Sequence, residues 1–396
     1  PSWEKVRDKA SVLALRFSRL SSLLAGLAGK LPSSHKGEAR EPLLLDARRA
    51  ESLAAAFGEA AAALEVFARD PEGESFHAHL RWVESAGGRA EYGDMADLRI
   101  KSAPASVGGE LFSLLFSRLD CAVFTSASLR AGGGKDGFAF FARRAGLDLV
   151  EESGRELRLL ALDSPFDYRN QVRFFAVPDL PEPAPAKGET RQYLENIGRV
   201  IEEAVLAMGG KTLVLLTSHE QVDFLYRELC PRLGRQGICC LRQQRGLPNA
   251  LLLERFRMDR DSVLLATEAF WEGVDVPGES LSAVVMAKLP FRHPDDPVVA
   301  GRMERENAVG GGGWDSYYMP LALTLFRQGI GRLVRHSTDR GIIVVLDPRF
   351  LNRHYSGRFR AALPRGMRIE TASRQELASL IRRASLWVPA GHGDAE

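Results

Sequence analysis

Between residues 111 and 346 the chain alternates apolar runs of strand length with amphipathic stretches of helical length. Continuous apolar strands separated by helices are typical of a parallel sheet covered by helices on both faces. The sequence therefore predicts an α/β domain with its functional residues just past the carboxyl ends of the strands. The predicted strands are Cys121–Thr125, Val172–Val177, Leu213–Thr217, Gly237–Leu241, Val263–Thr267, Ala283–Ala287 and Ile342–Leu346.

The first hundred residues have a different pattern. Apolar residues recur at helical spacing within 12–24 and within 53–67, and Pro32 with two serines interrupts the pattern between them. This arrangement predicts a helical hairpin. Short extended pieces from Phe76 to Ile100 surround Gly87-Gly88 and predict a β-hairpin.

Composition excludes several classes of protein. A chain of 396 residues with 45% hydrophobic and 26% charged residues suits two or three globular domains. No run reaches the roughly 18 uncharged apolar residues that span a bilayer, and the amino terminus lacks a signal-peptide pattern. We therefore expect a cytoplasmic protein without a membrane partner. The chain starts without Met and in a helical pattern, which favours an excised segment.

The four cysteines do not have the spacing of a metal site. Cys239 and Cys240 are adjacent while Cys121 and Cys230 are distant, so neither zinc nor an iron–sulfur cluster is expected. All but Cys230 fall in apolar runs, where a buried thiol is the expected state. The formal net charge of +2 is too small to indicate nucleic-acid binding by itself.

Two glycine-rich segments look like phosphate-binding loops but have the wrong context. Residues 209–212 (GGKT) have Val205 in place of the motif's first glycine, and a helix precedes them while a strand follows. That order reverses the P-loop geometry. Residues 132–136 lack both the first glycine and the closing hydroxyl residue. The chain also contains no Asp-Glu dipeptide, so an acidic pair that would orient magnesium and water beside a phosphate-binding loop is missing.

The residues best suited to chemistry come late in the chain. Within QGIGRLVR, spacings of four and three put Gln328, Arg332 and Arg335 on one side of a predicted helix. Such guanidinium groups can clamp a γ-phosphate that reaches in from a neighbouring domain. The alternative is a solvated basic face. The two embedded glycines favour the clamp, because each costs about 1 kcal/mol inside a helix and implies close approach of a ligand or backbone.

A second candidate region follows the predicted strand that ends at Thr267. The loop 267–278 contains an aromatic pair, two carboxylates and glycines, at a place where sheet proteins keep their sites. Phe270 and Trp271 have two interpretations, stacking on bases or anchoring the loop in the core, and we prefer the second. Ser218 also has two, because Gln221 three residues later gives it the pattern of a helix cap.

Together these segments resemble the DinG and XPD branch of superfamily 2 helicases, over about residues 100 to 370. The resemblance is closer to the bacterial DinG type than to XPD. The matching segments are FWEGVDVPGESL at 270–281 (motif V), KLPF at 288–291, QGIGRLVR at 328–335 (motif VI), DRGIIVVLDPR at 339–349, VFTSASL at 123–129 (motif III), SPFDYRNQ at 164–171 and VLLTS at 214–218 (motif IV).

The resemblance implies roles for individual residues. Arg332 and Arg335 would contact the phosphates of ATP, with Gln328 helping to position them. The remaining implied contacts are Glu272, Gly273 and Asp275 at the nucleotide and its coupling to the second motor domain, Thr217, Ser218, Thr267 and Trp271 on single-stranded or forked DNA, and Thr125 and Ser126 in transmission between the domains.

The resemblance also divides the chain. Residues 1–100 would be a helical arch insertion, 101–160 the last piece of a first RecA-like motor domain, 161–370 the second RecA-like domain, and 371–396 a terminal helix and tail. The Walker A and B motifs and the family's cysteine-rich cluster are not in this sequence. ATP and Mg²⁺ would therefore be bound mainly by an amino-terminal motor domain outside the chain.

Two functions from different classes follow. The first is the carboxy-terminal part of an ATP-dependent DNA helicase with 5′–3′ polarity in DNA repair or replication, inactive alone. The second is a non-catalytic module that binds nucleic acid or a protein partner and has lost the motor. The intact Gln328, Arg332 and Arg335 favour the first, because a protein without ATP does not need a phosphate clamp.

Overall fold

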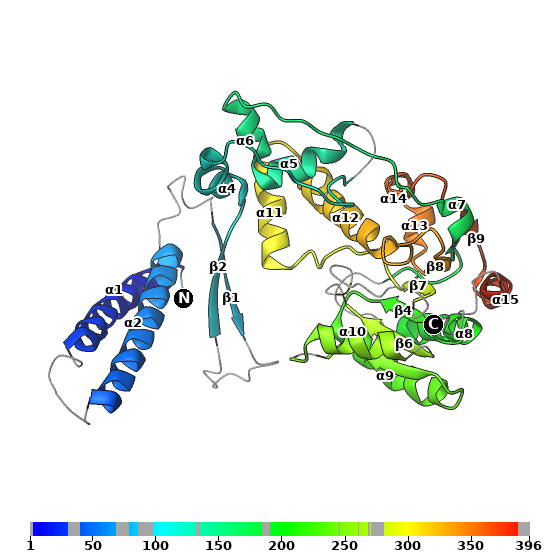
Figure 1. Cartoon of the computed structure of the whole chain (residues 1–396), viewed down its shortest axis with the longest axis horizontal. Coiled ribbons are helices and arrows are strands. Elements are labelled where there is room, and N and C mark those ends of the chain that lie inside the picture. The colour runs from blue at the N-terminus through cyan, green and yellow to red at the C-terminus, as the bar shows by residue number, and fades with distance from the viewer. Residues whose placement is uncertain are drawn as a thin grey trace. The chain divides into compact units, whose positions relative to one another are not determined.

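The computed structural model describes residues 3–30, 40–68, 79–85, 98–131, 135–183, 191–244, 246–259, 261–267, 270 and 281–386. The chain forms two compact units, and Figure 1 shows the elements of each. Unit 1 consists of Pro1–Val107 with Asp295–Arg305, and unit 2 of Gly108–Pro294 with Glu306–Glu396. The finer division into four segments stays a prediction.

Unit 1 begins with the predicted helical hairpin, formed by α1 (Trp3–Lys30) and α2 (Arg40–Ala68). Small residues Ala10 and Ala14 near the start of α1 are buried against Leu64 and Phe67 near the end of α2, which makes the helices antiparallel. By length and composition the segment Arg7–Lys30 could cross a membrane, contrary to expectation. The expectation considered only uncharged runs, and this segment is weak evidence of a span because helices of soluble proteins also pass the test.

The predicted β-hairpin is also present in unit 1. Strands β1 (His79–Ser85) and β2 (Leu98–Pro104) pair antiparallel, with Trp82 opposite Lys101. Lys101 Nζ lies 2.6 Å from Glu84 Oε2, and the other carboxylate oxygen, Oε1, accepts a hydrogen bond from the Trp82 indole at 2.7 Å. The turn at Gly87-Gly88 lies outside the described residues.

Unit 2 is built on a seven-stranded parallel sheet with strand order β5-β6-β4-β7-β8-β3-β9. The predictions from Val172 to Leu346 are confirmed as strands. The predictions missed β9, which is short and only half-buried. The strands are β3 (Val172–Ala176), β4 (Thr212–Leu215), β5 (Cys239–Arg242), β6 (Ser262–Ala266), β7 (Ala283–Met286), β8 (Gly341–Val345) and β9 (Ile369–Thr371).

Helices cover both faces of this sheet, as the continuous apolar strands require. Alternate residues of one strand face opposite cores: Leu213 and Leu215 enter one, while Val214 enters the other. The first core is closed by α10 (Asn249–Met258), α12 (Met319–Ile330), α13 (Arg349–Asn352) and α14 (Ser356–Ala361). The second is closed by α8 (Arg191–Met208), α9 (His219–Gly234) and α15 (Arg374–Ser385).

The segment before the sheet contains short helices, and the strand predicted there is absent. Residues 121–126 form no strand, and Cys121, expected to be buried, is exposed. An apolar run becomes a strand only where it has a partner, and none of the described strands pairs with this run. The helical elements outside the two layers are α4 (Gly108–Leu114), η2 (Phe116–Arg118), η3 (Lys135–Phe138), α5 (Ala139–Ala145), α6 (Leu147–Glu152), α7 (Tyr168–Gln171), α11 (Pro297–Ala308) and η6 (Trp314–Tyr318).

The GGKT segment is a turn between α8 and β4. Gly209 and Gly210 have φ of 65° and 87°, and their N–H groups donate to carbonyls of the last helical turn. This is the geometry of a helix carboxyl cap, which satisfies carbonyls and turns no donors toward a phosphate. The predicted rejection of a P-loop is confirmed here, while Gly132–Gly134 lie outside the described residues.

At Gly341, the first residue of β8, neighbouring atoms lie too close to the backbone for a side chain to fit. A Cβ at this position would lie 2.6 Å from Leu333 Cδ1 and 2.7 Å from the Ser282 carbonyl oxygen. Both contacts are shorter than real carbon neighbours tolerate, so a side chain would displace β8 or the loop that carries Leu333.

Gly341→Ala should therefore lower the free energy of unfolding by about 1–3 kcal/mol, the usual cost of overpacking. Gly357→Ala in α14 is the matched control, since nothing lies within 4 Å of its added Cβ and alanine favours helix by up to about 1 kcal/mol. Urea unfolding of both variants checks this. Equal stability of Gly341→Ala and the wild type would show that the packing is looser than described.

Candidate functional site

The arginine segment does not continue α12. The helix ends at Ile330, and Gly331 is its cap, with its N–H donating to the Arg327 carbonyl at 2.9 Å. Gln328 is thus on the helix, while Arg332 and Arg335 follow it in a turn. The prediction of one continuous helix face is wrong, because the chain leaves the helix at Gly331 and the burial of Leu333 and Val334 holds the following residues in a turn.

The turn is nevertheless anchored. Leu333 and Val334 are each 4% exposed and belong to the core beneath. Arg332 Nε donates to the Gln328 carbonyl at 3.2 Å, which directs that side chain back along the helix end. The backbone N–H of Arg335 donates to Asp339 Oδ2 at 2.8 Å. Both arginines are half-buried.

Positive charge is concentrated around this turn. Burial lowers the pKa of Arg335, and the neighbouring guanidinium of Arg257 lowers it further. Arg327, one residue before Gln328, has its pKa lowered by burial and then by Arg130. Cations that disfavour one another's charge are stabilised by an anion placed among them, and arginine forks suit the oxygens of a phosphate.

Gln328 adds a polar atom without a partner. Its Oε1 is buried and accepts no hydrogen bond from any residue that the structure describes. Such an atom costs about 1–3 kcal/mol unless a ligand or water satisfies it. The donor set and this orphan acceptor fit an occupant that carries both phosphate oxygens and a hydrogen-bond donor, as a nucleotide with its attacking water would.

The arginine turn and the threonines lie at opposite ends of the parallel strands. The turn precedes β8, so it lies at the amino-terminal end of the strands, whereas Thr217 and Thr267 follow β4 and β6 at the carboxyl-terminal end. Of the candidate residues, the threonines therefore follow strand ends as expected, whereas the arginines precede a strand. Because β4 and β6 are neighbouring strands, the two threonines are also neighbours.

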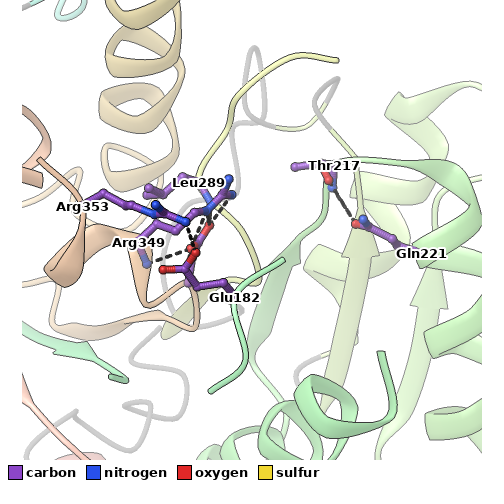
Figure 2. Close-up of polar contacts among 7 residues, drawn as sticks. Glu182, Thr217, Gln221, Leu289, Arg349 and Arg353 are labelled. Atoms are coloured by element: carbon purple, nitrogen blue, oxygen red, sulfur yellow. Dashed lines mark hydrogen bonds and ion pairs between the residues drawn. The ribbon is translucent and has the colours of Figure 1, made fainter. Parts of the chain in front are cut away.

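Each threonine is held by a glutamine in the same way. Thr217 donates its N–H and its hydroxyl to Gln221 Oε1, at 3.0 and 3.2 Å, as Figure 2 shows. Thr267 donates the same two groups to Gln243 Oε1, at 2.8 and 2.7 Å. A single oxygen thus accepts from both donors of each threonine. A backbone phosphate oxygen of DNA has the same acceptor character.

Ser218 is a helix cap, as one of its two interpretations predicted. Its Oγ accepts from the Gln221 N–H at 3.3 Å and begins α9. Phe270 is fully buried in the core, which favours the anchoring interpretation for that residue. Thr125 and Ser126 are exposed, and Ser126 Oγ lies 3.3 Å from Ser128 Oγ. The predicted Trp271, Glu272, Gly273 and Asp275 lie outside the described residues.

A buried ionic group was missed by the sequence interpretation. Asp347, 1% exposed, accepts a two-pronged contact from Arg349, with Nη2 at 2.6 Å, and a hydrogen bond from the Leu289 N–H at 2.9 Å. Figure 2 shows these groups beside the Arg353–Glu182 pair. The matching KLPF and DPR segments were the available signal, because the carboxyl ends of neighbouring strands β7 and β8 bring them together.

Lys288 belongs to this group. It is 9% exposed, and its Nζ lies 5.3 Å from the ring centroid of Tyr193. Burial lowers the pKa of Lys288 to about 8, and Arg349 contributes in the same direction. Asp347 opposes both effects. The cluster therefore holds more positive than negative charge.

The lowered pKa makes stability depend on pH. Between about 8 and the model-compound value of 10.5, the unfolded chain binds more protons at Lys288 than the folded chain, so the free energy of unfolding should rise with pH. The rise amounts to about 3 kcal/mol at most, at 1.36 kcal/mol per unit. Lys288→Met should remove this rise and be the more stable protein at pH 7. Urea unfolding at pH 7 to 9.5 measures it, with Lys9→Met at an exposed position of α1 as the control for the loss of one charge.

A hollow of about 250 Å³ between α8 and α9 and a shallower one on α10 lie away from the candidate residues. The shallow hollow of about 710 Å³ on α10 is lined by Leu251, Glu254, Arg255, Met258 and Asp259, and it contains none of the candidate residues. Within those same ranges, no group of three or more His, Cys, Asp or Glu residues is placed to hold a metal ion.

Comparisons with known proteins identify the family of this chain. Residues 201–366 match the family model of a helicase carboxy-terminal domain. The ATP-dependent DNA helicase YoaA of Escherichia coli is 34% identical over 271 residues, which cover 68% of this chain and 40% of YoaA. The ATP-dependent helicase DinG of Mycobacterium tuberculosis is 34% identical over 266 residues, covering 67% of this chain and 38% of DinG.

One further relative and one solved structure complete the comparison. The 3′-5′ exonuclease DinG of Bacillus subtilis is 34% identical over 269 residues, which cover 67% of this chain and 28% of that protein. A solved XPD helicase superposes with a TM-score of 0.52 at 13% identity, covering 93% of this chain and 64% of the XPD chain, and so shows likeness of fold. The chain thus spans well under half of these curated relatives. It belongs to the DinG and XPD branch of superfamily 2 helicases and contains the carboxy-terminal helicase domain of that family.

Proposed function

We propose that this chain is the carboxy-terminal part of an ATP-dependent DNA helicase with 5′–3′ polarity, acting on single-stranded or forked DNA in the cytoplasm. The observation that carries the proposal is the arginine turn. Its backbone is anchored, the Arg335 guanidinium lies near that of Arg257, and the adjacent Gln328 Oε1 has no partner among the described residues. These properties suit the γ-phosphate of a bound ATP and the water that attacks it.

In this proposal Arg332 and Arg335 stabilise charge that develops on the transferred phosphoryl group. Arginine suits that role because its planar fork keeps its charge and donates several hydrogen bonds at fixed angles. Magnesium and the inner phosphates would be held by an amino-terminal motor domain. Closure of the two motor domains on ATP and their opening after hydrolysis would shift the population between two states that grip DNA differently.

The carboxyl-terminal end of the parallel strands would hold the DNA backbone. The N–H and hydroxyl of Thr217 and of Thr267 donate to glutamine oxygens, and in this proposal a phosphate oxygen would take the place of each glutamine oxygen without reading sequence. The proposed contacts of Trp271, Glu272, Gly273 and Asp275 extend these contacts. Thr125 and Ser126 would pass the nucleotide state between the motor domains.

Exposed apolar segments support the presence of a further motor domain. Val123 is 84% exposed, Leu160 76% and Leu162 82%, in two segments that run without helix or strand assignment. Contiguous exposed apolar surface marks a place where another protein layer packs. Strands of an amino-terminal motor domain would cover both segments, and pairing with the first would form the strand that the sequence predicts at Cys121–Thr125.

The rival function is a non-catalytic module that binds nucleic acid or a protein. Such a module has no need of an anchored turn that holds Arg335 close to Arg257 against their mutual repulsion. The exonuclease named for the Bacillus subtilis relative is not carried over, because the chain covers 28% of that protein.

The chain alone should hydrolyse ATP no faster than its Arg332→Ala variant, with or without single-stranded DNA. The physical reason is that it supplies the outer arginines and lacks the P-loop and acidic pair that hold phosphates and magnesium. A coupled assay of phosphate release measures this. Sustained hydrolysis that the substitution abolishes would show that the chain is a complete motor.

In the full-length protein, Arg335→Ala should lower the turnover of ATP by about 10³–10⁵, the measured range for arginine fingers. Arg335→Lys should be nearly as defective, since lysine keeps the charge and loses the fork. Arg365→Ala is the control, because that arginine is 89% exposed and loosely paired with Asp163 at 3.5 Å. Normal turnover by Arg335→Ala would remove the arginine turn from the mechanism.

A further inference from the structure

We infer that Gln171 and Asp339 are positioning residues that fix the backbone beneath Arg335 and so aim its guanidinium group. The inference rests on the proposed function, since it gives a role in phosphate contact to residues that would not touch the nucleotide. Four hydrogen bonds carry it, and all of them converge on the five residues from Arg335 to Asp339.

Gln171 reaches the turn from a distant part of the sequence. It is 5% exposed, and its Nε2 donates to the carbonyl oxygens of His336 and Asp339, both at 2.9 Å. Two carbonyl acceptors require the NH₂ side of the amide at this point, so the orientation of the side chain is determined by its partners. A buried amide that spans two carbonyls holds the turn at both ends.

Asp339 holds the same turn from inside. Its Oδ2 accepts from the backbone N–H groups of Arg335 and His336, both at 2.8 Å. Its own N–H donates to the His336 carbonyl at 3.2 Å, which closes the turn. The side chain therefore fixes the N–H of Arg335, while Gln171 fixes the carbonyls that follow.

The sheet explains why these groups meet. Strands β3 and β8 are parallel neighbours with Val172 opposite Gly341. Gln171 stands one residue before β3, and Asp339 stands two residues before β8. The amide of Gln171 therefore lies alongside the entry to β8, and its position is set by the most buried part of the molecule.

The direction of Arg335 depends on this brace more than that of Arg332 does. Arg332 is adjacent to the helix end and to Leu333, which the core holds, whereas Arg335 begins the part of the turn that leaves the core. A displacement of about 1 Å at a catalytic group can cost about 100-fold in rate. Loss of the brace should thus lower turnover and leave the binding of ground-state ATP and of DNA nearly unchanged.

The test uses the full-length protein. Gln171→Met keeps the volume and removes the donors, and Asp339→Ala removes the acceptor, whereas Asp339→Asn retains an acceptor oxygen in the same shape. We expect kcat of DNA-stimulated ATP hydrolysis to fall by up to about 100-fold for the first two variants. KM for ATP and affinity for single-stranded DNA should change by less than about two-fold, and Asp339→Asn should retain most of the activity. Gln236→Met at an exposed turn is the control.

Combination with Arg335→Ala separates aiming from general damage. If Gln171 acts through Arg335, Gln171→Met should have no further effect on kcat in the Arg335→Ala background. A full additional loss there would overturn the inference and give Gln171 a structural role only. So would normal kcat in Gln171→Met and Asp339→Ala while Arg335→Ala is inactive. Normal turnover by Arg335→Ala would instead overturn the proposed function. If Gln171→Met does not fold, Asp339→Ala and Asp339→Asn carry the same comparison.

Discussion

The parallel pairing of β3 with β8 is the interaction on which the candidate nucleotide site depends. It joins residues about 170 positions apart in register, with Val172 opposite Gly341, and both of these residues are buried. The turn that carries Arg335 leads directly into β8, and the close packing of Leu333 on Gly341 leaves no room for another path. A loop whose exit is fixed this firmly can hold guanidinium groups near one another, because the cost of their repulsion is met by the burial of the strand behind them.

The same sheet separates two kinds of polar group. Arginines lie before β8 at the amino-terminal end of the strands, and paired threonine donors lie after β4 and β6 at the carboxyl-terminal end. Five residues of strand span about 16 Å, so the two ends are too far apart for direct contact. The strands between them are fully buried on both faces and cannot deform locally without loss of packing. In the proposed helicase, coupling between nucleotide and DNA would therefore occur by movement of the whole domain.

Sequence alone predicted the parts of the fold in which local pattern and tertiary context agree. Buried parallel strands are continuously apolar, and the cap at Ser218 satisfies a donor three residues away. The prediction of a helix through Arg335 failed because periodicity does not report that packing of Leu333 and Val334 draws the chain into a turn after Ile330. The prediction of a strand at Cys121–Thr125 failed because an apolar pattern shows only that a segment can form a strand. It does not show whether this chain contains a strand that pairs with it.

The groups that build the sites were harder to predict, for a physical reason. The Gln171 amide bonds carbonyls 165 and 168 positions away, and Asp347 bonds the Leu289 N–H 58 positions away. A backbone carbonyl or N–H carries no mark in the sequence, so its partner cannot be found from residue types. KLPF and DPR were recognised as matching segments, yet only the pairing of β7 with β8 shows that they form one ionic group. The family resemblance located the segments, and the sheet register decided which of their atoms meet.

Burial is complete in one part of unit 2 and incomplete in another. The seven-stranded layer has a closed core on each face, whereas residues 108–157 gather around a small cluster of Phe116, Ala145 and Leu147. Arg155 holds this segment together through carbonyls of Phe116 and Asp120, at 2.6 and 3.0 Å, which replaces part of the missing apolar burial with charged hydrogen bonds. Exposed Val123 and Leu162 show that this does not suffice to bury the apolar runs. The sheet with its two closed cores carries the arginine turn, and the incompletely buried segment carries Thr125 and Ser126. A further protein layer packed on that segment would place a new surface next to Thr125 and Ser126, the residues proposed to transmit the nucleotide state.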